Sequence, residues 1–416
     1  MREILHLQVG NCGNQLGKLN WENIFDEYSI DINGKLEVNN ENIQEKIGVY
    51  LEEKQDQKYI ARNISICKYN EVLNPGFYFK NHYDERDFIE IENSWNWAKG
   101  YYRKEGDDDI RDLVRAKAEA CDSLQAFEFS HSLGGGSGSG LTSRIIETLK
   151  DEFSDILFCF QTVFPSPKVS DCVVEPYNVV LSFPFLHMPD NLIFAIDIES
   201  LMRILLKRYK IPNPTYGDIN HLAAQVLGGA TSTFRFPGMI NGDLKKMMKN
   251  LAPIETMNFL VPGFSPFTCR CNCMRHSGEI QDFFRDIVSE NAMCEIVETN
   301  RITSMACCFR GFEEKSQQIE DFFRSEGTFV NGIEIKNIKY SMTEFKPRGL
   351  KRGASSLINT TGFKDILNRI HQDFDFMKRR NAFLHWYLSE GVEIEEFNQA
   401  SHEVIDLIET YRSYEN

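Results

Sequence analysis

The chain has 416 residues, of which 42% are hydrophobic and 26% are charged, and its formal net charge is −15. This composition is typical of a globular protein with two or three domains, and so negative a charge argues against non-specific nucleic-acid binding. No stretch predicts a membrane span or a secretory signal, so we expect neither nucleic acid nor a membrane as a partner. The 11 cysteines are irregularly spaced and predict reduced thiols in the cytoplasm.

The chain opens with a predicted strand over residues 3–9. A turn at residues 10–13 leads from this strand into a helix, so the turn can present backbone N–H groups to an anion. His6 lies within the strand and is expected to be a core histidine rather than a ligand. Residues 34–57 are polar and acidic, which predicts a surface excursion. Three aspartates at 107–109 begin a further predicted helix, over residues 107–124.

Five glycines within seven residues, 134–140, form the most distinctive stretch. Residues 126–132 before it alternate as a strand does, and Leu141, Ile145 and Leu149 after it recur at helical spacing. A glycine loop between a strand and a helix lets N–H groups converge on a phosphate. The run is not a P-loop, because Leu141 stands where a lysine is required, and it lacks the acid of a Rossmann fingerprint. We interpret it as a phosphate cradle; a glycine-rich loop without a ligand is the alternative.

Strands and helices alternate after the glycine run, with strands predicted at 156–163 and 192–196 and a helix at 201–209. This alternation predicts a mainly parallel sheet covered on both faces. From about residue 222 the pattern predicts a second α/β unit, and residues 363–414 carry two helical patterns. Five residues of that last stretch are expected on its buried side: Phe374, Met377, Phe383, Trp386 and Tyr387. The CxCxC at 269–273 has no evident fourth ligand, so we predict no zinc site there.

Several long motifs are similar to those of tubulins, and the β branch fits best. They are MREILHLQVGNCGNQLG at the start, HSLGGGSGSG, FPSPKVSDCVVEPYN, PTYGDINHL, FRFPGMINGDL, PRGLK and RRNAFLHWY. The resemblance implies an α/β, tubulin/FtsZ-like fold. It places a parallel-sheet GTP-binding domain at residues 1–197, a second α/β intermediate domain at 198–361 and a C-terminal helical hairpin at 362–416, on the outer, motor-facing surface of a microtubule.

The resemblance also implies a guanine-nucleotide site for GTP or GDP. Its residues would be Gly10, Asn11, Cys12, Gln15, Ser132, Gly134, Gly135, Gly136, Ser137 and Gly138 near the phosphates, Asp171 and Glu175 near the ribose, and Tyr216 and Asn220 at the guanine. The residue types also suit the parts of a nucleotide without reference to the family. An aromatic face can stack on a base, an amide can read a purine edge, carboxylates can take ribose hydroxyls and backbone N–H groups can take phosphates.

Departures from the tubulin pattern gather at the terminal phosphate. Cys67 and Tyr69 replace acids that help position magnesium, and residues 94–97 shorten a turn and introduce Trp95. Ile198 also replaces a base-contacting asparagine. Hydrogen bonds to charged groups contribute about 1.5–3 kcal/mol each, so losing two or three predicts triphosphate binding weakened by about 10³-fold. We therefore expect weak discrimination of GTP from GDP, doubtful Mg²⁺ binding and no metal site in the chain.

Hydrolysis is expected to depend on a partner. In the family a glutamate of α-tubulin completes it across the longitudinal contact, and Lys246 stands at the matching position here. An ammonium with an ordinary pKa near about 10.4 is a poor general base. The chain is β-like in this respect and is expected to contain no catalytic residue and to show very low intrinsic activity.

Two functional hypotheses follow. The first is a divergent β-tubulin that pairs with α-tubulin in the microtubules of the cytoplasm, where it meets microtubule-associated proteins. The second is a degenerate tubulin that regulates assembly without entering the lattice and binds GTP weakly or not at all. An autonomous metabolic enzyme lacks support, because no catalytic constellation is evident. The lateral loop at 271–277 is short and the family's acidic tail is absent after residue 416, which predicts weak lateral contacts and co-assembly at low stoichiometry.

Overall fold

The structure is a computed structural model that describes residues 2–37, 45–68, 80–103, 106–170, 172–238, 243–269, 272–273, 279–297, 299–325 and 327–415. Expectations for the remaining residues, among them Tyr69, Asp171 and most of the loop at 271–277, lie outside this set.

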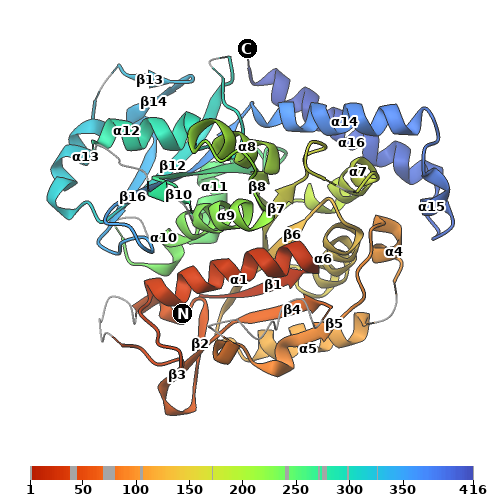
Figure 1. Cartoon of the computed structure of the whole chain (residues 1–416), viewed down its shortest axis with the longest axis horizontal. Helices are drawn as coiled ribbons and strands as arrows, with labels where there is room; N and C mark the ends of the chain where they lie inside the picture. Colours follow the sequence, from red (N-terminus) through yellow and green to blue (C-terminus); the bar gives the residue numbers. More distant parts are fainter. Residues whose placement is uncertain are drawn as a thin grey trace.

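One ten-stranded sheet runs through the molecule (Figure 1). In spatial order its strands are β15 (Lys339–Thr343), β12 (Ile302–Arg310), β16 (Gly353–Thr360), β9 (Phe259–Ser265), β8 (Asn191–Asp197), β7 (Leu157–Phe164), β6 (Leu124–Ser132), β1 (Glu3–Val9), β4 (Asn63–Cys67) and β5 (Phe88–Glu90). The strands from β5 to β9 pair in parallel, whereas β16 is antiparallel to both of its neighbours. The predicted mainly parallel sheet is confirmed, and it continues without a break into the second α/β unit.

Helices cover both faces of this sheet (Figure 1). They are α1 (Gly10–Glu27), α4 (Trp97–Tyr101), α5 (Asp107–Glu119), α6 (Thr142–Glu152), α7 (Glu175–Leu186), α8 (Ile198–Arg203), α9 (Tyr216–Ala230), α10 (Ser232–Arg235), α11 (Leu244–Leu251), α12 (Ile280–Arg285), α13 (Ser316–Phe323), α14 (Phe363–Lys378), α15 (Leu384–Leu388) and α16 (Ile394–Ser413). Short hairpins, including β2 (Leu51–Lys54) with β3 (Lys58–Ala61), complete the chain. Among the described residues no helix is both long and apolar enough to cross a membrane.

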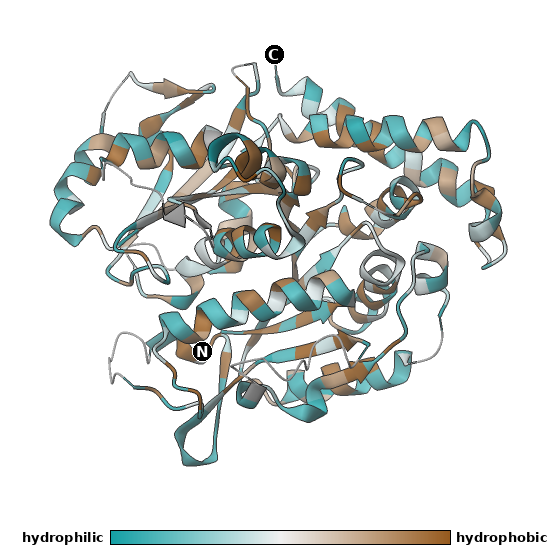
Figure 2. Ribbon diagram, in the orientation of Figure 1, coloured by the Kyte–Doolittle hydropathy of each residue, from teal (hydrophilic) through white to brown (hydrophobic). Residues whose placement is uncertain are grey.

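The alternation of side chains along β1 divides the interior into two hydrophobic cores. Leu5, Leu7 and Val9 face the core that α5, α6, α7, α14 and α16 complete. Ile4 faces a smaller core with Trp21 and other residues of α1. Because every residue of β1 is buried, the strand is fixed from both faces. Figure 2 shows the hydrophobic colouring concentrated on the strands and on the helix faces that turn toward them.

His6 belongs to the smaller core, as predicted. Its ring lies against Trp21, with 5.7 Å between ring centroids, and its Nε2 is 2.7 Å from Ser130 Oγ. Burial lowers the pKa of His6 to about 3, so the imidazole is neutral at physiological pH. The histidine is thus a core residue of the strand pair β1–β6, with Nε2 paired and Nδ1 without a hydrogen-bond partner among the described residues.

Some expectations about individual segments are wrong. The predicted surface excursion includes residues that are buried in the smaller core, such as Tyr50 and Leu51, because the β2–β3 hairpin folds back onto α1 and β1. The helix that begins at Asp107 ends at Glu119, since the chain must enter β6 at Leu124. Helix α1 starts at Gly10 itself, without a separate turn.

The C-terminal stretch forms α14 and α16, with the short α15 between them, so the two predicted helical patterns are confirmed. Phe374 and Tyr387 are buried against α7 and α16, as expected. Trp386 is 45% exposed, which contradicts the prediction that it is buried. The reason is that α15 is separate from α14, so the helical spacing carried over from α14 assigns the wrong face.

Candidate nucleotide-binding site

A cavity of about 520 Å³ opens where the parallel strands β1, β6, β7 and β8 end. The carboxyl edge of such a sheet is the usual place for a ligand in open α/β folds. Twelve of the fourteen residues predicted for the nucleotide line this cavity: Gly10, Asn11, Cys12, Gln15, Ser132, Gly134, Gly135, Ser137, Gly138, Glu175, Tyr216 and Asn220. The fold thus brings together residues that are more than 200 positions apart in the sequence.

The phosphate side of the cavity is built from the start of α1 and the glycine loop, which touch. A Cβ on Gly10 would lie 3.1 Å from the Gly138 backbone nitrogen, so the start of α1 and the glycine loop pack backbone to backbone. Neither start carries an acidic residue in its first turn, so the partial positive charge of both N-termini is uncompensated. Gly135 lines the cavity, and its N–H has no acceptor in the described part of the chain. This geometry suits an anion.

Buried polar contacts hold the glycine loop in place. The His131 ring lies with Nδ1 2.9 Å from the Gly138 carbonyl oxygen and Nε2 3.0 Å from Thr162 Oγ1. Burial lowers the pKa of His131 to about 4, so the ring is neutral and bridges the loop to β7. Ser139 adds a hydrogen bond from its hydroxyl to the Gly135 carbonyl oxygen over 2.7 Å. The loop is therefore shaped in advance of any ligand.

Gly136 is the predicted glycine that does not face the cavity. A Cβ at this position would collide with the carbonyl oxygen of Asn96. Its missing side chain lets the segment 94–97 approach the glycine loop, where the Ser94 N–H donates to Ser137 Oγ over 2.7 Å and the Ser137 N–H donates to the Ser94 carbonyl oxygen over 3.1 Å. Gly136 has a packing role in this structure.

The opposite side of the cavity is formed by the start of α9 and the first turns of α1. Tyr216 is 52% exposed and its hydroxyl donates to the Val169 carbonyl oxygen over 3.1 Å. One turn later the Asn220 amide donates to Gln15 Oε1 over 3.2 Å, and Gln15 donates to Asn11 Oδ1 over 2.8 Å. An aromatic ring and a chain of amides can stack on and read a purine.

Glu175, at the start of α7, places its carboxyl group against the glycine loop, since a Cβ on Gly134 would lie 2.6 Å from its Oε1. The Ser170 hydroxyl donates to it, and burial raises the pKa of Glu175 to about 7. The carboxyl is thus poised between its neutral and ionised forms near pH 7 and can donate to or accept from a sugar hydroxyl. Asp171, the other residue predicted for the ribose, lies outside the described residues.

Cys12 and Ser132 sit side by side below the phosphate loop. Burial raises the pKa of the Cys12 thiol to about 11, while the Ser132 hydroxyl, hydrogen-bonded to it, acts in the opposite direction. A protonated, buried thiol is a poor nucleophile. These two residues therefore line the cavity as neutral polar groups.

The described lining contains no lysine or arginine, and Glu175 is its only carboxylate. In the described part of the chain no group of three histidine, cysteine, aspartate or glutamate residues could hold a metal ion. The lining residues thus do not fit a protein-bound magnesium ion, and an anion there depends on backbone N–H groups and helix N-termini.

Several lining residues were not singled out from the sequence, among them Ser166, Ser170, Cys172, Leu201, Ile219 and Ala223. Ser166, Ser170 and Cys172 follow β7, and Leu201 lies on α8. The sequence could have indicated Ser166, Ser170 and Cys172, because a loop that follows a parallel strand next to a glycine turn lies at the carboxyl edge of the sheet. Ile219 and Ala223 face the cavity as one side of α9, which the helical period around Tyr216 predicts.

Lys246 lies far from this cavity, at the other end of the strands. It is exposed on α11, whose N-cap Asp243 forms an ion pair with Arg2, directly before β1. Gln125, near the start of β6, also donates to Asp243 over 2.8 Å. Helix α11 therefore begins at the amino ends of the strands whose carboxyl ends form the cavity.

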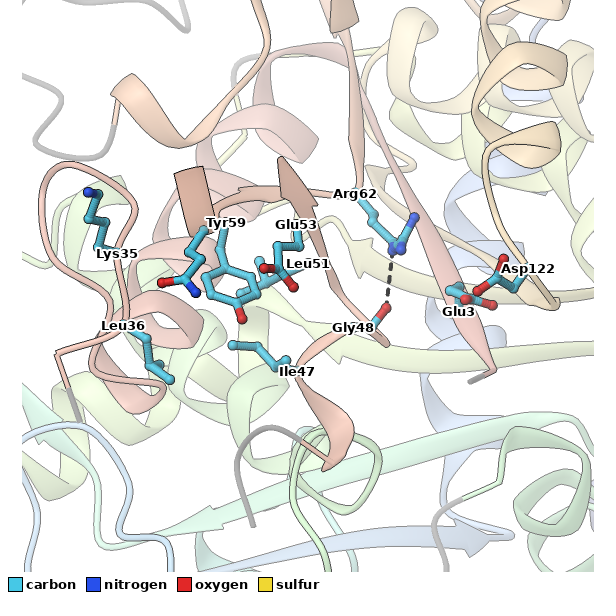
Figure 3. A pocket seen from close by; sticks show the side chains of 11 residues that line it. Glu3, Lys35, Leu36, Ile47, Gly48, Leu51, Glu53, Tyr59, Arg62 and Asp122 are labelled. Atoms are coloured by element: carbon cyan, nitrogen blue, oxygen red, sulfur yellow. Dashed lines mark hydrogen bonds between the residues drawn. The ribbon is translucent and has the colours of Figure 1, made fainter. Parts of the chain in front are cut away.

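A second cavity, of about 650 Å³, also lies at the amino end of β1 (Figure 3). Arg62 donates through Nε to the Gly48 carbonyl oxygen over 3.1 Å, and Glu3 accepts from the Ser123 N–H over 2.9 Å. Figure 3 shows Lys35 at one end of this cavity and Asp122 at the other. Its charged lining residues are Glu3, Lys35, Glu53, Arg62 and Asp122. Acids outnumber bases there, so the cavity offers no surplus positive charge to an anion.

Similarity to known proteins agrees with the geometry of the first cavity. Residues 3–205 match the family model described as Tubulin/FtsZ family, GTPase domain. All of the chain aligns at 36% identity with the Tubulin beta-6 chain of Gallus gallus, across 96% of that protein. Identity is 36% to the Tubulin beta-1 chain of Homo sapiens, across 95% of it, and 37% to the nucleomorph Tubulin beta chain of Guillardia theta, across 97%. The chain belongs to the tubulin family. It is a divergent, β-tubulin-like member.

The predicted family and fold are therefore confirmed. The α/β sheet with its C-terminal helices is the tubulin/FtsZ type, and the strand ends that form the cavity, from β1 to β8, lie within the matched GTPase domain. In this tubulin-family chain the glycine loop, the start of α1 and the start of α9 converge on one cavity, which Trp95 also lines.

Proposed function

We propose that this chain is a guanine-nucleotide-binding structural subunit of microtubules that pairs with α-tubulin. The observation that carries the proposal is the polarity of the molecule. A nucleotide-sized cavity lies at the carboxyl ends of the strands, and α11 lies at their amino ends. Stacking such subunits head to tail brings the α11 end of one against the cavity end of the next, which generates a filament rather than a closed dimer.

Several features support GTP or GDP as the ligand. The volume of about 520 Å³ suits a nucleotide, and groups that can bind phosphates, accept sugar hydroxyls and stack on a base all line this one cavity. We assign the fourteen predicted residues to this role, with Gly136 acting through its packing against Asn96. Magnesium, if bound, has to be held by the phosphates and water, because the described lining offers no set of carboxylates.

The proposal gives this chain no catalytic residue. The described lining contains no base aimed at a terminal phosphate, and Lys246 of α11, which stacking presents to the next subunit, carries an ammonium instead of a carboxylate. Hydrolysis of a bound nucleotide thus depends on a residue of the partner α-tubulin. The isolated chain is expected to turn over GTP negligibly.

We further propose that the chain is organised as domains at residues 1–197, 198–361 and 362–416, and that it resides in the microtubule cytoskeleton of the cytoplasm. Its short lateral loop at 271–277 favours co-assembly at low stoichiometry over a lattice built with this β subunit alone. The alternative is an assembly regulator that stays outside the lattice. The experiment described next distinguishes a lattice subunit from such a regulator.

The test is to purify the tagged full chain together with α-tubulin, measure stoichiometry, and image both the products of assembly and the protein in cells. We expect an equimolar heterodimer and incorporation into microtubules. A protein that is monomeric, diffuse and excluded from polymers would contradict subunit function and favour the regulator. Abundant closed microtubules made with this chain as the sole β subunit would contradict weak lateral contacts.

A further inference from the structure

Trp95 stands at the rim of the nucleotide cavity and is 69% exposed, the highest value among the large hydrophobic residues of the described chain. An indole left so open to water needs a reason, since aromatic side chains are normally used to fill space or to contact a ligand. Its neighbours Asn93 and Ser94 line the same cavity.

The backbone that carries Trp95 is fixed to the phosphate loop. The Asn178 side chain donates to the carbonyl oxygens of Trp95, over 2.8 Å, and Gly134, over 2.7 Å. Asn178 Oδ1 also accepts from the Trp97 N–H over 2.8 Å, so one buried amide joins the two segments. Together with the paired hydrogen bonds between Ser94 and Ser137, these contacts hold the segment against the glycine loop.

The position of the loop decides where a phosphate chain meets this segment. The nearest atom to a Cβ on Gly135 would be the Ser94 carbonyl oxygen, at 3.9 Å, so the Ser94 backbone faces the glycine loop there, and Trp95, the next residue, also lines the cavity. A phosphate beyond those held by the loop finds a carbonyl oxygen and an apolar ring. No lysine or arginine of the described lining is present to offset its charge. Moving a charge from water to such a surface is unfavourable.

We propose that Trp95 is a specificity-determining residue that restricts this cavity to a nucleoside diphosphate and disfavours the triphosphate. The inference rests on the proposed guanine-nucleotide binding and adds the length of the phosphate chain to it. The glycine loop and the two helix starts hold the two phosphates nearest the sugar, and the indole, carried on a backbone that is hydrogen-bonded next to the loop, disfavours a third.

The experiment measures the affinities of the full chain, depleted of nucleotide by exchange, for GDP and for GTP with and without magnesium. The wild-type protein is compared with Trp95→Gly, which removes the ring, and Trp95→Phe, which keeps an apolar ring. Trp386→Phe is the matched control, because it alters another exposed tryptophan that does not line the cavity. Melting temperatures verify that each variant is folded.

We expect the wild type and both phenylalanine variants to prefer GDP by about tenfold or more, a difference of about 1.4 kcal/mol. Trp95→Gly should strengthen GTP binding, with GDP affinity nearly unchanged, so that the preference disappears. The tryptophan emission of the wild type should also change on GDP binding, and this signal should shrink in Trp95→Phe but not in Trp386→Phe. Equal affinities of the wild type for GDP and GTP would overturn the role of Trp95, and so would a ratio of the two affinities that Trp95→Gly leaves unchanged. Either result leaves the proposed nucleotide binding intact. Failure of every variant to bind either nucleotide overturns both proposals.

Discussion

The two cavities at the ends of β1 differ in how they are built. At the amino end, charged side chains of both signs line the cavity, and some of them hydrogen-bond to nearby backbone groups, as Arg62 does with Gly48. At the carboxyl end, the lining is neutral apart from Glu175, and its polar character comes from a glycine loop and two helix starts. The larger cavity is therefore the poorer anion site. The volume of a cavity therefore does not identify an anion-binding site. Backbone N–H groups without an acceptor, at the carboxyl ends of parallel strands, are the better indication.

The largest effect expected from this comparison comes from adding one methyl group to the glycine loop. In Gly138→Ala the new Cβ would collide with the Ser132 carbonyl oxygen, which displaces the loop from the anion. Losing two hydrogen bonds to a charged group removes about 3 kcal/mol, so the nucleotide affinity should fall by about 100-fold. Equilibrium binding of GDP measures this change.

Gly228→Ala, on a part of α9 that does not line the cavity, is the matched control, because its Cβ would meet no side chain nearer than 3.8 Å. It should bind GDP within about threefold of the wild type, a difference under about 1 kcal/mol. Similar losses in both variants, with both melting normally, would show that the loop does not position the phosphates.

A second prediction concerns the strand pair that separates the two cavities. Glu128 on β6, the register partner of His6 in β1, is 1% exposed. Burial raises its pKa from 4.5 to about 7, opposed by the neighbouring Gln161, Tyr50 and the charge of Arg235. The folded state therefore binds this proton more tightly than the unfolded state. The contribution of this proton to the free energy of unfolding is fully present below about pH 4.5. It is lost as the pH rises to about 7, and the loss totals about 3 kcal/mol.

Glu128→Gln should remove this loss, so the free energy of unfolding at pH 8 should exceed that of the wild type while the two converge near pH 4.5. Chemical denaturation at several pH values measures it. His6 titrates in both proteins and so cancels in the difference. Glu119→Gln, an exposed acid at the end of α5, is the control and should leave the pH dependence unchanged. Parallel pH profiles of wild type and Glu128→Gln would contradict the raised pKa.

A smaller effect is expected at the base side of the nucleotide cavity. Tyr216→Ala removes the exposed ring at the start of α9, and base stacking on an aromatic ring is worth about 1–3 kcal/mol, so affinity for GDP should fall by about tenfold. Tyr216→Phe keeps the ring and loses only the hydrogen bond to Val169, so it should bind almost normally. An equal loss in both variants would assign the effect to the hydroxyl rather than to stacking.

The smallest effect should come from the cavity at the amino end. The double variant Arg62→Gln, Asp122→Asn removes one charge of each sign from its lining and leaves the glycine loop untouched. Its affinity for GDP should change less than about twofold, or about 0.4 kcal/mol. A loss of tenfold or more would refute the distinction drawn between the cavities.

Much of this fold is predictable from the sequence where local and long-range signals agree. The strands β1 and β6 and the helices after them follow from apolar periodicity that ends in glycines. Strand β16 was not predicted, because GASSLINT has few apolar residues. Its small polar side chains are buried through tertiary hydrogen bonds, such as those from Ser355 to the Gly229 carbonyl oxygen and from Ser356 to the Ile287 carbonyl oxygen. Those partners are distant in sequence.

The candidate site shows the same limit. Glycine content and the family resemblance identify which residues gather at the cavity, but they do not show which way each one faces. Gly136 turns toward Asn96, and the segment with Trp95 is tied to the loop through Asn178, a contact across more than 80 positions. The prediction that Trp386 is buried was wrong for a related reason. Helix α15 is separate from α14, so its buried face does not follow from the spacing in α14.

The most direct test of the account is to denature the purified native chain and identify the nucleotide that it releases. We predict an equimolar amount of guanine nucleotide, mainly GDP, from the wild type and from Gly228→Ala, and almost none from Gly138→Ala. Release of no guanine nucleotide from the folded wild-type protein, or equal release from wild type and Gly138→Ala, would contradict the assignment of the cavity at the carboxyl end of β1 as the nucleotide site.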